Sequence, residues 1–452
     1  MCRAAVATLL VNVVVGCDLR QSPDQHMFTF PAKISAMQSA EMGPASTESG
    51  GPHKDWPQWR GAERDGIAGA NDLLDEWPSE GPPLLWTASG LGSGMSSVSI
   101  AHESIFTLGH WDGKVWLVCL SAIDGAKRWA TEICEGDVPN GTPTVDGQHV
   151  FAITREGRVV CSESATGKII WMRDFVSEFG GSIPTWGYSE SPLVEEGRVI
   201  CTPGADDALI VALDRSTGES IWKTPVPTQM QNKGHAGAGY SSAMVSHAAG
   251  VHHYVQMFGC GVVGVAAADG AMLWGYSRVA NQTAVIPTPI IHGDYVFVSS
   301  GYGTGAALLK LVSTASGLDP EEVYFHRGSE VQNHHGGMVL FDGFVYMGHG
   351  NNKGFPLCMD LMSGTVKWGP VRGPGNGSAA VALAEGHLYF RYENSRMALI
   401  EATPLGYNEK SIFEIPSNLG KSWPHPAIAR KRLYLRDQDV LLCYDLAKEV
   451  RN

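Results

Sequence analysis

The phrase SAIDGAKRW, Ser121 to Trp129, decides the fold because it recurs along the chain. In each copy a glycine is followed by three residues and then a tryptophan, and an Asp, Thr or Ser stands just before the glycine. The later copies are SATGKIIW, DRSTGESIW, AADGAMLW and LMSGTVKW, which end at Trp171, Trp222, Trp274 and Trp368. Self-similarity at a spacing of about 40 to 50 residues indicates a protein built from repeated structural units.

Each unit has the pattern of four short antiparallel strands. A turn followed by alternating apolar residues, as in EGRVICTP or GDYVFVSS, comes first, and an apolar run such as KVWLVCL comes before the glycine. Alternation with period two is typical of strands, and the Asp-Gly and Thr-Gly pairs supply the positive φ of tight hairpins. Because one such sheet cannot bury its faces alone, the copies must stack, and the tryptophan covers its own sheet against the next.

We count eight units, and the last one is incomplete. They begin near Ser96, Gly141, Ser189, Tyr240, Pro287, Gly336, Gly377 and Trp423. Units five and seven lack the tryptophan and have Glu321 to Phe325 and Ser411 to Ile415 in its place. Unit eight stops after LLCYDL without a last strand, whereas the strand pattern PPLLWTAS around Trp86 precedes unit one. We therefore expect an all-β, eight-bladed β-propeller of four-stranded antiparallel blades, whose ring is closed by the N-terminal strand so that no open edge remains.

Composition agrees with a propeller and argues against a nucleic-acid partner. The chain of 452 residues is longer than one compact core usually requires, and its 54 glycines and 17% charged residues suit short strands joined by turns. The net charge is −13 and we find no long Lys/Arg run, so binding to nucleic acid is not expected. We expect a monomer that binds a partner protein or a small-molecule ligand.

The N-terminal residues 1–17 predict a signal peptide. Arg3 precedes an apolar run of 13 residues from Ala4 to Gly16, which is too short to span a bilayer. The ending VVGC resembles a lipobox with Cys17 as the lipidated residue; an ordinary signal peptide and a start codon placed too early are the alternatives. The expected location is the periplasm or cell envelope, with membrane contact only through a lipid anchor at Cys17.

The remaining domain boundaries follow from the repeat. Residues 18–54 carry no hydrophobic period and are rich in Ser, Ala, Gly and Pro, so we predict a disordered tether. Residues 55–447 are assigned to the propeller and residues 448–452 to a tail.

Seven of the nine cysteines lie outside the leader, and no CxxC, CxxCH or adjacent pair occurs. This spacing excludes c-type haem attachment and the common zinc motifs. Cys119, Cys161, Cys201 and Cys443 lie in apolar strand patterns and are predicted to be small buried hydrophobes. Seven unpaired thiols are in mild tension with export.

The Gly-x-x-x-Trp phrase resembles the pyrroloquinoline-quinone (PQQ)-type propeller repeat. That group includes the quinoprotein alcohol dehydrogenases and the propeller lipoprotein of the outer-membrane β-barrel assembly machine. The stretch DWPQWRG, Asp55 to Gly61, also resembles the mature start of a bacterial group with this repeat. The resemblance covers roughly residues 55–447 and implies the fold more strongly than an activity, because the repeat is scaffold.

For the dehydrogenases, the resemblance implies a quinone over the axis with Ca²⁺, an Asp base, a Trp floor and often a disulfide of adjacent cysteines. Ca²⁺ takes six or more oxygen ligands, and the base must reach the substrate hydroxyl. The chain has no adjacent cysteines and no assignable set of Glu, Asn and Asp, so no catalytic residue is carried over. PQQ and Ca²⁺ stay open as cofactors, because such sites draw on several blades.

The starts of the eight innermost strands are expected to face one mouth of the axial channel, and most are small residues. Against that background, eight bulky or ionisable residues stand out and should converge: Trp186, Tyr188, Glu190, Tyr240, His334, His335, Trp423 and His425. Glu190, His334 and His335 are the candidate catalytic residues, as an acid/base pair or part of a metal site, although we assign no metal ligand. The aromatic residues and His425 would form an axial site for a flat ligand.

These candidates also have structural explanations. Tyr188 and Tyr240 occupy equivalent repeat positions, so packing between blades would explain both. Glu190 replaces the equivalent of Ser242 and, if buried, needs a partner or water. Adjacent strand residues point to opposite faces, so we expect His334 and His335 to face opposite ways, with one facing the channel.

Two functions are consistent with the sequence. One is an exported binding or scaffold propeller that presents its axial mouth to a partner protein or small ligand. The other is a quinoprotein-like dehydrogenase that oxidises an alcohol or sugar with PQQ and Ca²⁺. Convergence of the candidates around an open pocket would favour a ligand or an enzyme site.

Overall fold

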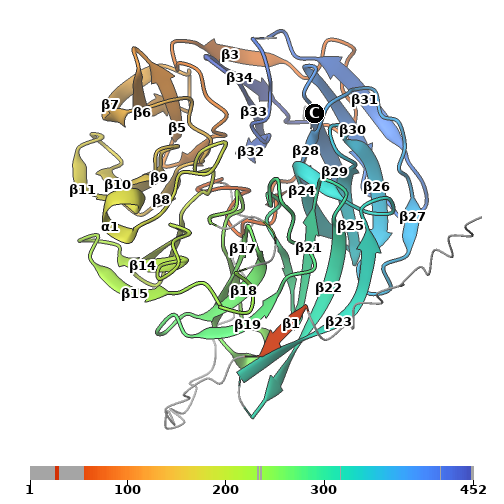
Figure 1. Ribbon diagram of the computed structural model, residues 1–452. Coiled ribbons are helices and arrows are strands. Elements are labelled where there is room, and N and C mark those ends of the chain that lie inside the picture. Colours follow the sequence, from red (N-terminus) through yellow and green to blue (C-terminus); the bar gives the residue numbers. More distant parts are fainter. Residues whose placement is uncertain are drawn as a thin grey trace, which may run out of the picture.

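The computed structural model describes residues 26–29, 55–231, 234, 237–315, 317–417 and 419–448. These residues form eight β-sheets arranged in a ring around a central axis (Figure 1). The predicted all-β, eight-bladed propeller is therefore confirmed. The predicted signal peptide and lipid-anchor site (residues 1–17) and most of the predicted tether (residues 18–54) lie outside the described residues.

The blades follow one another in chain order, and each has four antiparallel strands of which the first lies nearest the axis. The strands of blades one to four are β4 (Ser99–Ala101), β5 (Ser104–Trp111), β6 (Lys114–Ser121), β7 (Lys127–Glu135); β8 (Thr144–Asp146), β9 (His149–Ile153), β10 (Arg158–Glu163), β11 (Ile169–Asp174); β12 (Leu193–Glu195), β13 (Arg198–Cys201), β14 (Ile210–Asp214), β15 (Ser220–Thr224); β16 (Met244–Ser246), β17 (His253–Phe258), β18 (Gly261–Ala266) and β19 (Met272–Tyr276). The strands of blades five to eight are β20 (Ile290–His292), β21 (Tyr295–Ser300), β22 (Gly305–Thr314), β23 (Gly317–Arg327); β24 (Asn333–Phe341), β25 (Phe344–His349), β26 (Phe355–Asp360), β27 (Val366–Trp368); β28 (Ala379–Ala384), β29 (His387–Tyr392), β30 (Arg396–Glu401), β31 (Glu409–Glu414); β32 (Ala427–Ala429), β33 (Arg432–Asp437), β34 (Val440–Asp445) and β3 (Leu84–Ala88).

The ring closes where the sequence predicts. Strand β3 pairs antiparallel with β34, so that the N-terminal strand completes blade eight. Outside the sheets lie the short helix α1 (Phe175–Phe179) and the 3₁₀ turn η2 (Ala248–Gly250). Within the described part of the chain, no helix combines the length and the apolar character that crossing a membrane requires.

The repeated tryptophan connects each blade to the next one. Trp129 of blade one lies over Gly167 of blade two, where a Cβ atom on the glycine would be only 2.5 Å from the ring. Its indole N–H donates to the Ser164 carbonyl of the same neighbour at 3.2 Å. Trp171 makes the same pair of contacts with Gly218 and Arg215 of blade three. The glycine of the Gly-x-x-x-Trp phrase is therefore required by the ring of the preceding blade as well as by its own turn.

The two blades without the tryptophan use other aromatic rings in the same way. Tyr324 of blade five donates its hydroxyl to the Leu361 carbonyl at 2.6 Å and packs against Gly364 of blade six. Phe413 of blade seven packs against Gly81, just before the closing strand. Both rings lie in the segments that the sequence placed at the missing tryptophans, so that prediction is confirmed.

The cysteines behave as the strand pattern predicts. All seven within the described residues are free, and Cys119, Cys161, Cys201 and Cys443 are buried in the blades. Burial raises the pKa of these thiols, so they remain protonated small hydrophobes.

A segment that the repeat does not predict crosses the axis of the ring, and we call residues 55–68 the axial segment. Trp56 exchanges two backbone hydrogen bonds with Ile100 on blade one, at 3.0 and 2.7 Å, and the Pro57 carbonyl accepts the Val145 N–H of blade two at 2.8 Å. At its other end, β2 (Ile67–Ala68) pairs in parallel with β28 on the inner edge of blade seven. The chain therefore spans the centre of its own propeller.

Two arginines of the axial segment are buried and make no ion pair with any described residue. Arg60 donates to the backbone carbonyls of Arg64 and, on blade six, Met338. Arg64 donates to the Ser191 carbonyl of blade three at 2.9 Å. Burial lowers the pKa of both guanidinium groups to about 10, so both stay charged at neutral pH. Because a buried carbonyl without a donor costs free energy, these bonds hold the axial segment in one position.

We expect Arg60→Met to destabilise the protein by roughly 3 kcal/mol, because the variant leaves buried carbonyls of two chain segments without a donor. Urea unfolding followed by tryptophan fluorescence measures the loss. Arg396→Met, at an exposed arginine that reaches only the Pro374 carbonyl, is the matched control and should change stability little. Equal losses in the two variants would contradict the role of Arg60.

Candidate functional site

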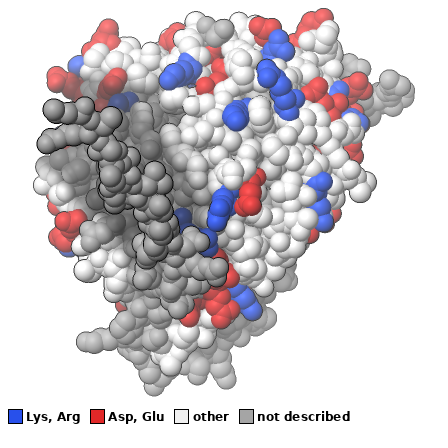
Figure 2. All heavy atoms as spheres, turned by 45° about the vertical axis from the view of Figure 1, so that its right-hand side comes forward, with Lys and Arg blue, Asp and Glu red and all other residues white. Residues whose placement is uncertain are grey.

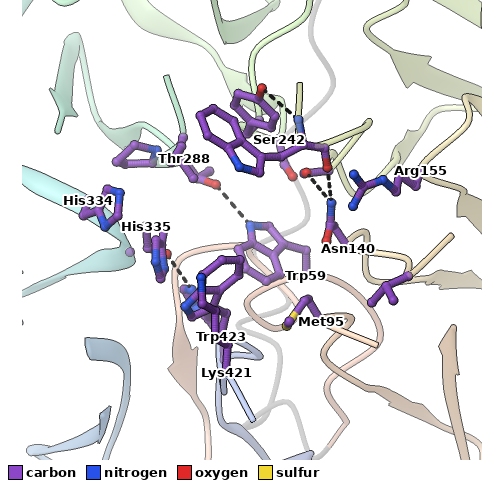
Figure 3. Close-up of a pocket in the computed structure, with 18 of the residues that line it drawn as sticks. Trp59, Met95, Asn140, Arg155, Ser242, Thr288, His334, His335, Lys421 and Trp423 are labelled. Carbon is purple, nitrogen blue, oxygen red and sulfur yellow. Dashed lines mark hydrogen bonds between the residues drawn. The ribbon is translucent and has the colours of Figure 1, made fainter. Parts of the chain in front are cut away.

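A cavity of about 520 Å³ opens at the mouth of the ring where the inner strands begin. Residues that precede or start these strands in blades one to six and eight form its wall. Trp59 of the axial segment also lines it and lies at the centre of the view in Figure 3. Its indole N–H donates to Thr288 of blade five at 3.1 Å. The axial segment thus turns a channel into a pocket with Trp59 in its floor.

Most of the predicted axial residues meet in this pocket. Six of the eight line it: Trp186, Tyr240, His334, His335, Trp423 and His425. The rings contact one another in pairs, such as Trp186 with Tyr240 at 5.7 Å between centroids and Trp59 with His425 at 4.5 Å. His335 and Trp423 are also neighbours, although they belong to blades six and eight, because the ring brings the strand starts together.

The prediction that His334 and His335 face opposite ways is wrong. Both line the pocket, and their ring centroids are 4.4 Å apart. The pairing of β24 with β25 shifts in register between Asn333 and Met338, and Gly337 has a φ of +74°. Strand alternation therefore does not apply at this point, because the backbone is not extended throughout.

His334 and His425 are buried and neutral. His334 makes hydrogen bonds through both ring nitrogens, to Ser378 Oγ at 2.7 Å and to the Tyr302 hydroxyl at 2.9 Å. His425 donates from Nε2 to the His335 carbonyl at 3.1 Å. Burial lowers the pKa of His334 to about 4 and that of His425 to about 3, with the neighbouring His335 and Arg60 adding to the respective shifts. These two imidazoles carry no charge at neutral pH.

His335 belongs to a more polar corner of the pocket. Its Nε2 lies 3.5 Å from a carboxylate oxygen of Glu393, and its ring centroid lies 5.0 Å from that of Trp423. Burial alone would raise the pKa of Glu393, but hydrogen bonds from His335 and from the Ser378 N–H lower it below the ordinary value. The Lys421 ammonium lies 5.1 Å from the Trp423 ring.

Tyr188 and Glu190 are placed between blades and do not line the pocket. The Tyr188 hydroxyl donates to the Pro203 carbonyl at 3.0 Å, and its ring packs on Phe175. Glu190 is 2% exposed and accepts hydrogen bonds from the N–H and hydroxyl of Thr202, at 2.8 and 3.0 Å. The structure therefore does not bring Glu190 to the histidines, and packing explains both residues.

The pKa of Glu190 is raised by burial to about 8, although bonds from Thr202 and the charge of Arg64 act in the opposite direction. The folded state then binds more protons than the unfolded state between about pH 5 and 8, so stability falls as the pH rises through that window.

We expect Glu190→Gln to remove this dependence and to gain on the order of 4 kcal/mol over the native chain at pH 8, but less than about 1 kcal/mol at pH 5. Urea unfolding at the two pH values measures it. Glu219→Gln, at an exposed carboxylate, should retain the native pH dependence. If the free energy of unfolding of Glu190→Gln changed with pH in parallel with that of the native chain, Glu190 would be ionised in the folded protein and the prediction would be wrong.

The pocket residues that sequence reasoning missed include the aromatic Trp59 and Tyr302 and the basic Arg155 and Lys421. Trp59 lies in DWPQWRG, and the two tryptophans and the arginine of this stretch could have indicated a functional segment because they lie outside the repeat. Arg155 and Tyr302 lie in turns between the second and third strands of blades two and five, where nothing in the local sequence separates them from other turn residues.

The pocket residues do not fit a PQQ–Ca²⁺ pair. Ca²⁺ takes six to eight oxygen ligands and usually includes carboxylates, whereas the described residues that line the pocket include no aspartate or glutamate. Among the described residues, two carboxylates approach residues of the wall from outside it, Glu393 beside His335 and Asp137 beside Arg155. No group of three or more His, Cys, Asp or Glu side chains in the described ranges is placed to hold a metal ion.

Comparison with known families agrees with the repeat. Residues 112–369, more than half of the chain, match the family described as outer membrane protein assembly factor BamB. The chain belongs to this family. This match confirms the predicted PQQ-like repeat. No curated protein matches the chain.

Solved structures show the same fold at low sequence identity. BamB from Moraxella catarrhalis is 14% identical with a TM-score of 0.58, and the match covers 82% of this chain and 98% of that one. Quinohemoprotein alcohol dehydrogenase from Comamonas testosteroni is 12% identical with a TM-score of 0.64, covering 88% and 81%. A europium-containing methanol dehydrogenase is 11% identical with a TM-score of 0.62, covering 84% and 89%. At these identities the likeness concerns the fold, which an outer membrane protein assembly factor and dehydrogenases share.

Proposed function

We propose that this chain is an exported, monomeric binding protein of the cell envelope whose axial pocket holds a small planar anion. The observation that carries the proposal is the composition of the pocket wall, which combines five aromatic rings and two basic side chains and has no carboxylate among its described residues. The rings are Trp59, Trp186, Tyr240, Tyr302 and Trp423, and the basic side chains are Arg155 and Lys421.

The aromatic residues favour a flat ligand. Trp186 and Tyr240 contact each other in the lining at 5.7 Å between ring centroids. Trp59 and Trp423 are two further rings of the pocket (Figure 3). The Trp59 indole N–H is already bonded to Thr288, which fixes the orientation of its ring. A pocket with rings held on several sides binds a planar molecule by stacking and burial of apolar surface.

The charges favour an anion. Arg155 lies across the pocket from His334 and His335, and its nearest carboxylate is Asp137 at 3.7 Å, outside the wall. On the outer face shown in Figure 2, by contrast, basic and acidic side chains are interspersed. Because the chain has a net charge of −13, a pocket with basic groups alone is a local exception that would attract a negative ligand.

The dehydrogenase alternative has less support. It requires a base within reach of a substrate hydroxyl and a ligand set for Ca²⁺. Both nitrogens of His334 are engaged, and Glu190 lies outside the pocket. His335 with Glu393 is the pair that could accept a proton, so a catalytic role for His335 stays a prediction rather than part of the proposed function.

Membership of the BamB family supports binding to a partner protein in general, and we include this in the proposal. The signal-like residues 1–17 support export, and Cys17 is the proposed site of a lipid anchor.

Isothermal titration of the purified protein with PQQ, used as a planar trianionic probe without Ca²⁺, tests the proposed function. We expect binding that Ca²⁺ does not strengthen and that Arg155→Gln with Lys421→Gln weakens by about tenfold, because each partly exposed charge contributes about 1 kcal/mol or less. Lys168→Gln, at an exposed hairpin lysine, is the control and should bind as the native chain does.

Two results would contradict the proposal. One is no heat of binding at about 100 μM probe, a concentration that detects even weak complexes. The other is quinone- and Ca²⁺-dependent oxidation of alcohols with an artificial electron acceptor, which would establish the dehydrogenase instead.

A further inference from the structure

The outer edge of blade four carries a fifth strand from a distant part of the chain. Strand β1 (Met27–Thr29) pairs antiparallel with β19, so that Met27 lies opposite Tyr276 and Phe28 opposite Gly275. The Ser277 N–H extends this ladder by donating to the His26 carbonyl at 2.9 Å. Among the described strands, this is the one case of a strand added to the outside of a complete blade.

The neighbouring blade supplies a wall for this strand. Strands β22 and β23 of blade five have 10 and 11 residues and are the longest in the described chain, whereas β19 has five. β1 contacts both β19 and β23 and lies between them in Figure 1. The added strand therefore occupies a groove between two blades.

The groove is held together by residues that do not belong to its occupant. The Tyr276 hydroxyl donates to Glu322 at 2.5 Å, and Arg278 pairs with the other oxygen of that carboxylate at 2.7 Å. The Arg278 guanidinium also lies 3.8 Å from the centre of the Phe325 ring. These contacts join the end of β19 to β23 directly, so the groove does not need β1 to exist.

The occupant is bound mainly through its backbone. An outer strand presents unpaired N–H and C=O groups that any extended peptide can use. Met27 adds an apolar contact, because it packs against the buried cluster that contains Trp274, Tyr276 and Leu318. A strand of three residues has few such bonds, so its hold on the edge is weak and reversible.

We propose that the outer edge of blade four is a strand-accepting site for an extended peptide with an apolar residue at the Met27 position. Residues 26–29 of the chain itself occupy the site as an exchangeable resident. The acceptor is preformed and the resident strand has only three residues, so an incoming peptide that offers the same backbone groups and apolar contact can compete with it. This inference concerns the outer rim and does not depend on the axial pocket.

A peptide with the sequence of residues 22–33, labelled with a fluorophore, tests the proposal in the full-length protein. Phe28→Pro removes a backbone N–H from the middle of the resident strand and should vacate the edge without touching the ring. We expect the peptide to bind the Phe28→Pro protein at least about five times more tightly than the native protein, because no resident competes. The same peptide carrying proline at position 28 is the control and should bind neither.

Hydrogen exchange of the Ser277 amide provides a second readout at the site itself. We expect this amide to exchange faster in the Phe28→Pro protein than in the native protein, and added peptide should restore its protection. Val263, in the interior of the same sheet, should be unaffected. Equal Ser277 exchange in the two proteins together with no peptide binding to either would overturn the proposal, as would peptide binding that leaves Ser277 unprotected.

Discussion

The structure depends on one contact that recurs, among the described residues, at six of the eight blade junctions, namely an aromatic side chain of one blade lying over a glycine of the next. Trp129 on Gly167 and Trp171 on Gly218 are two examples, and the indole N–H adds a bond to a carbonyl of the same neighbour. A side chain on the glycine would collide with the ring, so both residues of the phrase are constrained together. Blade five obtains the same contact from Tyr324 and blade seven from Phe413, so a flat aromatic ring is the requirement rather than tryptophan itself.

Stacking of blades leaves a hole at the centre, and the axial segment fills it. Charged side chains are costly to bury, yet Arg60 and Arg64 are buried there because each guanidinium group donates to backbone carbonyls of the blades around it, such as those of Met338 and Ser191. The same insertion places Trp59 under the mouth of the ring. The pocket is therefore a product of two parts of the chain, the repeat that makes its wall and the non-repeating segment that makes its floor.

Within that pocket, electrostatics follow from burial. His334 and His425 lose their charge because the surrounding blades exclude water, whereas Arg155 is half-buried and Lys421 is exposed. A neutral, ring-lined interior below basic groups is suited to a flat molecule whose charged end faces the mouth. The outer groove at blade four works differently, since it offers backbone groups and an apolar contact rather than a shaped cavity.

The sequence by itself determined the number of blades, the strand that closes the ring, the burial of the cysteines and most of the residues at the axial mouth, because each of these follows from repeat register and strand alternation. Strand alternation failed to predict the directions of His334 and His335, because the register between β24 and β25 shifts in the stretch that contains these histidines and the two glycines after them. Position in the repeat also could not show that the Glu190 side chain is bonded to Thr202 away from the pocket whereas the Trp186 side chain lines the pocket. Only the tertiary structure decided that residues 55–68 cross the axis and that residues 26–29 join blade four, because both segments lie outside the repeat and depend on partners such as Met338 and β19 that lie hundreds of residues away.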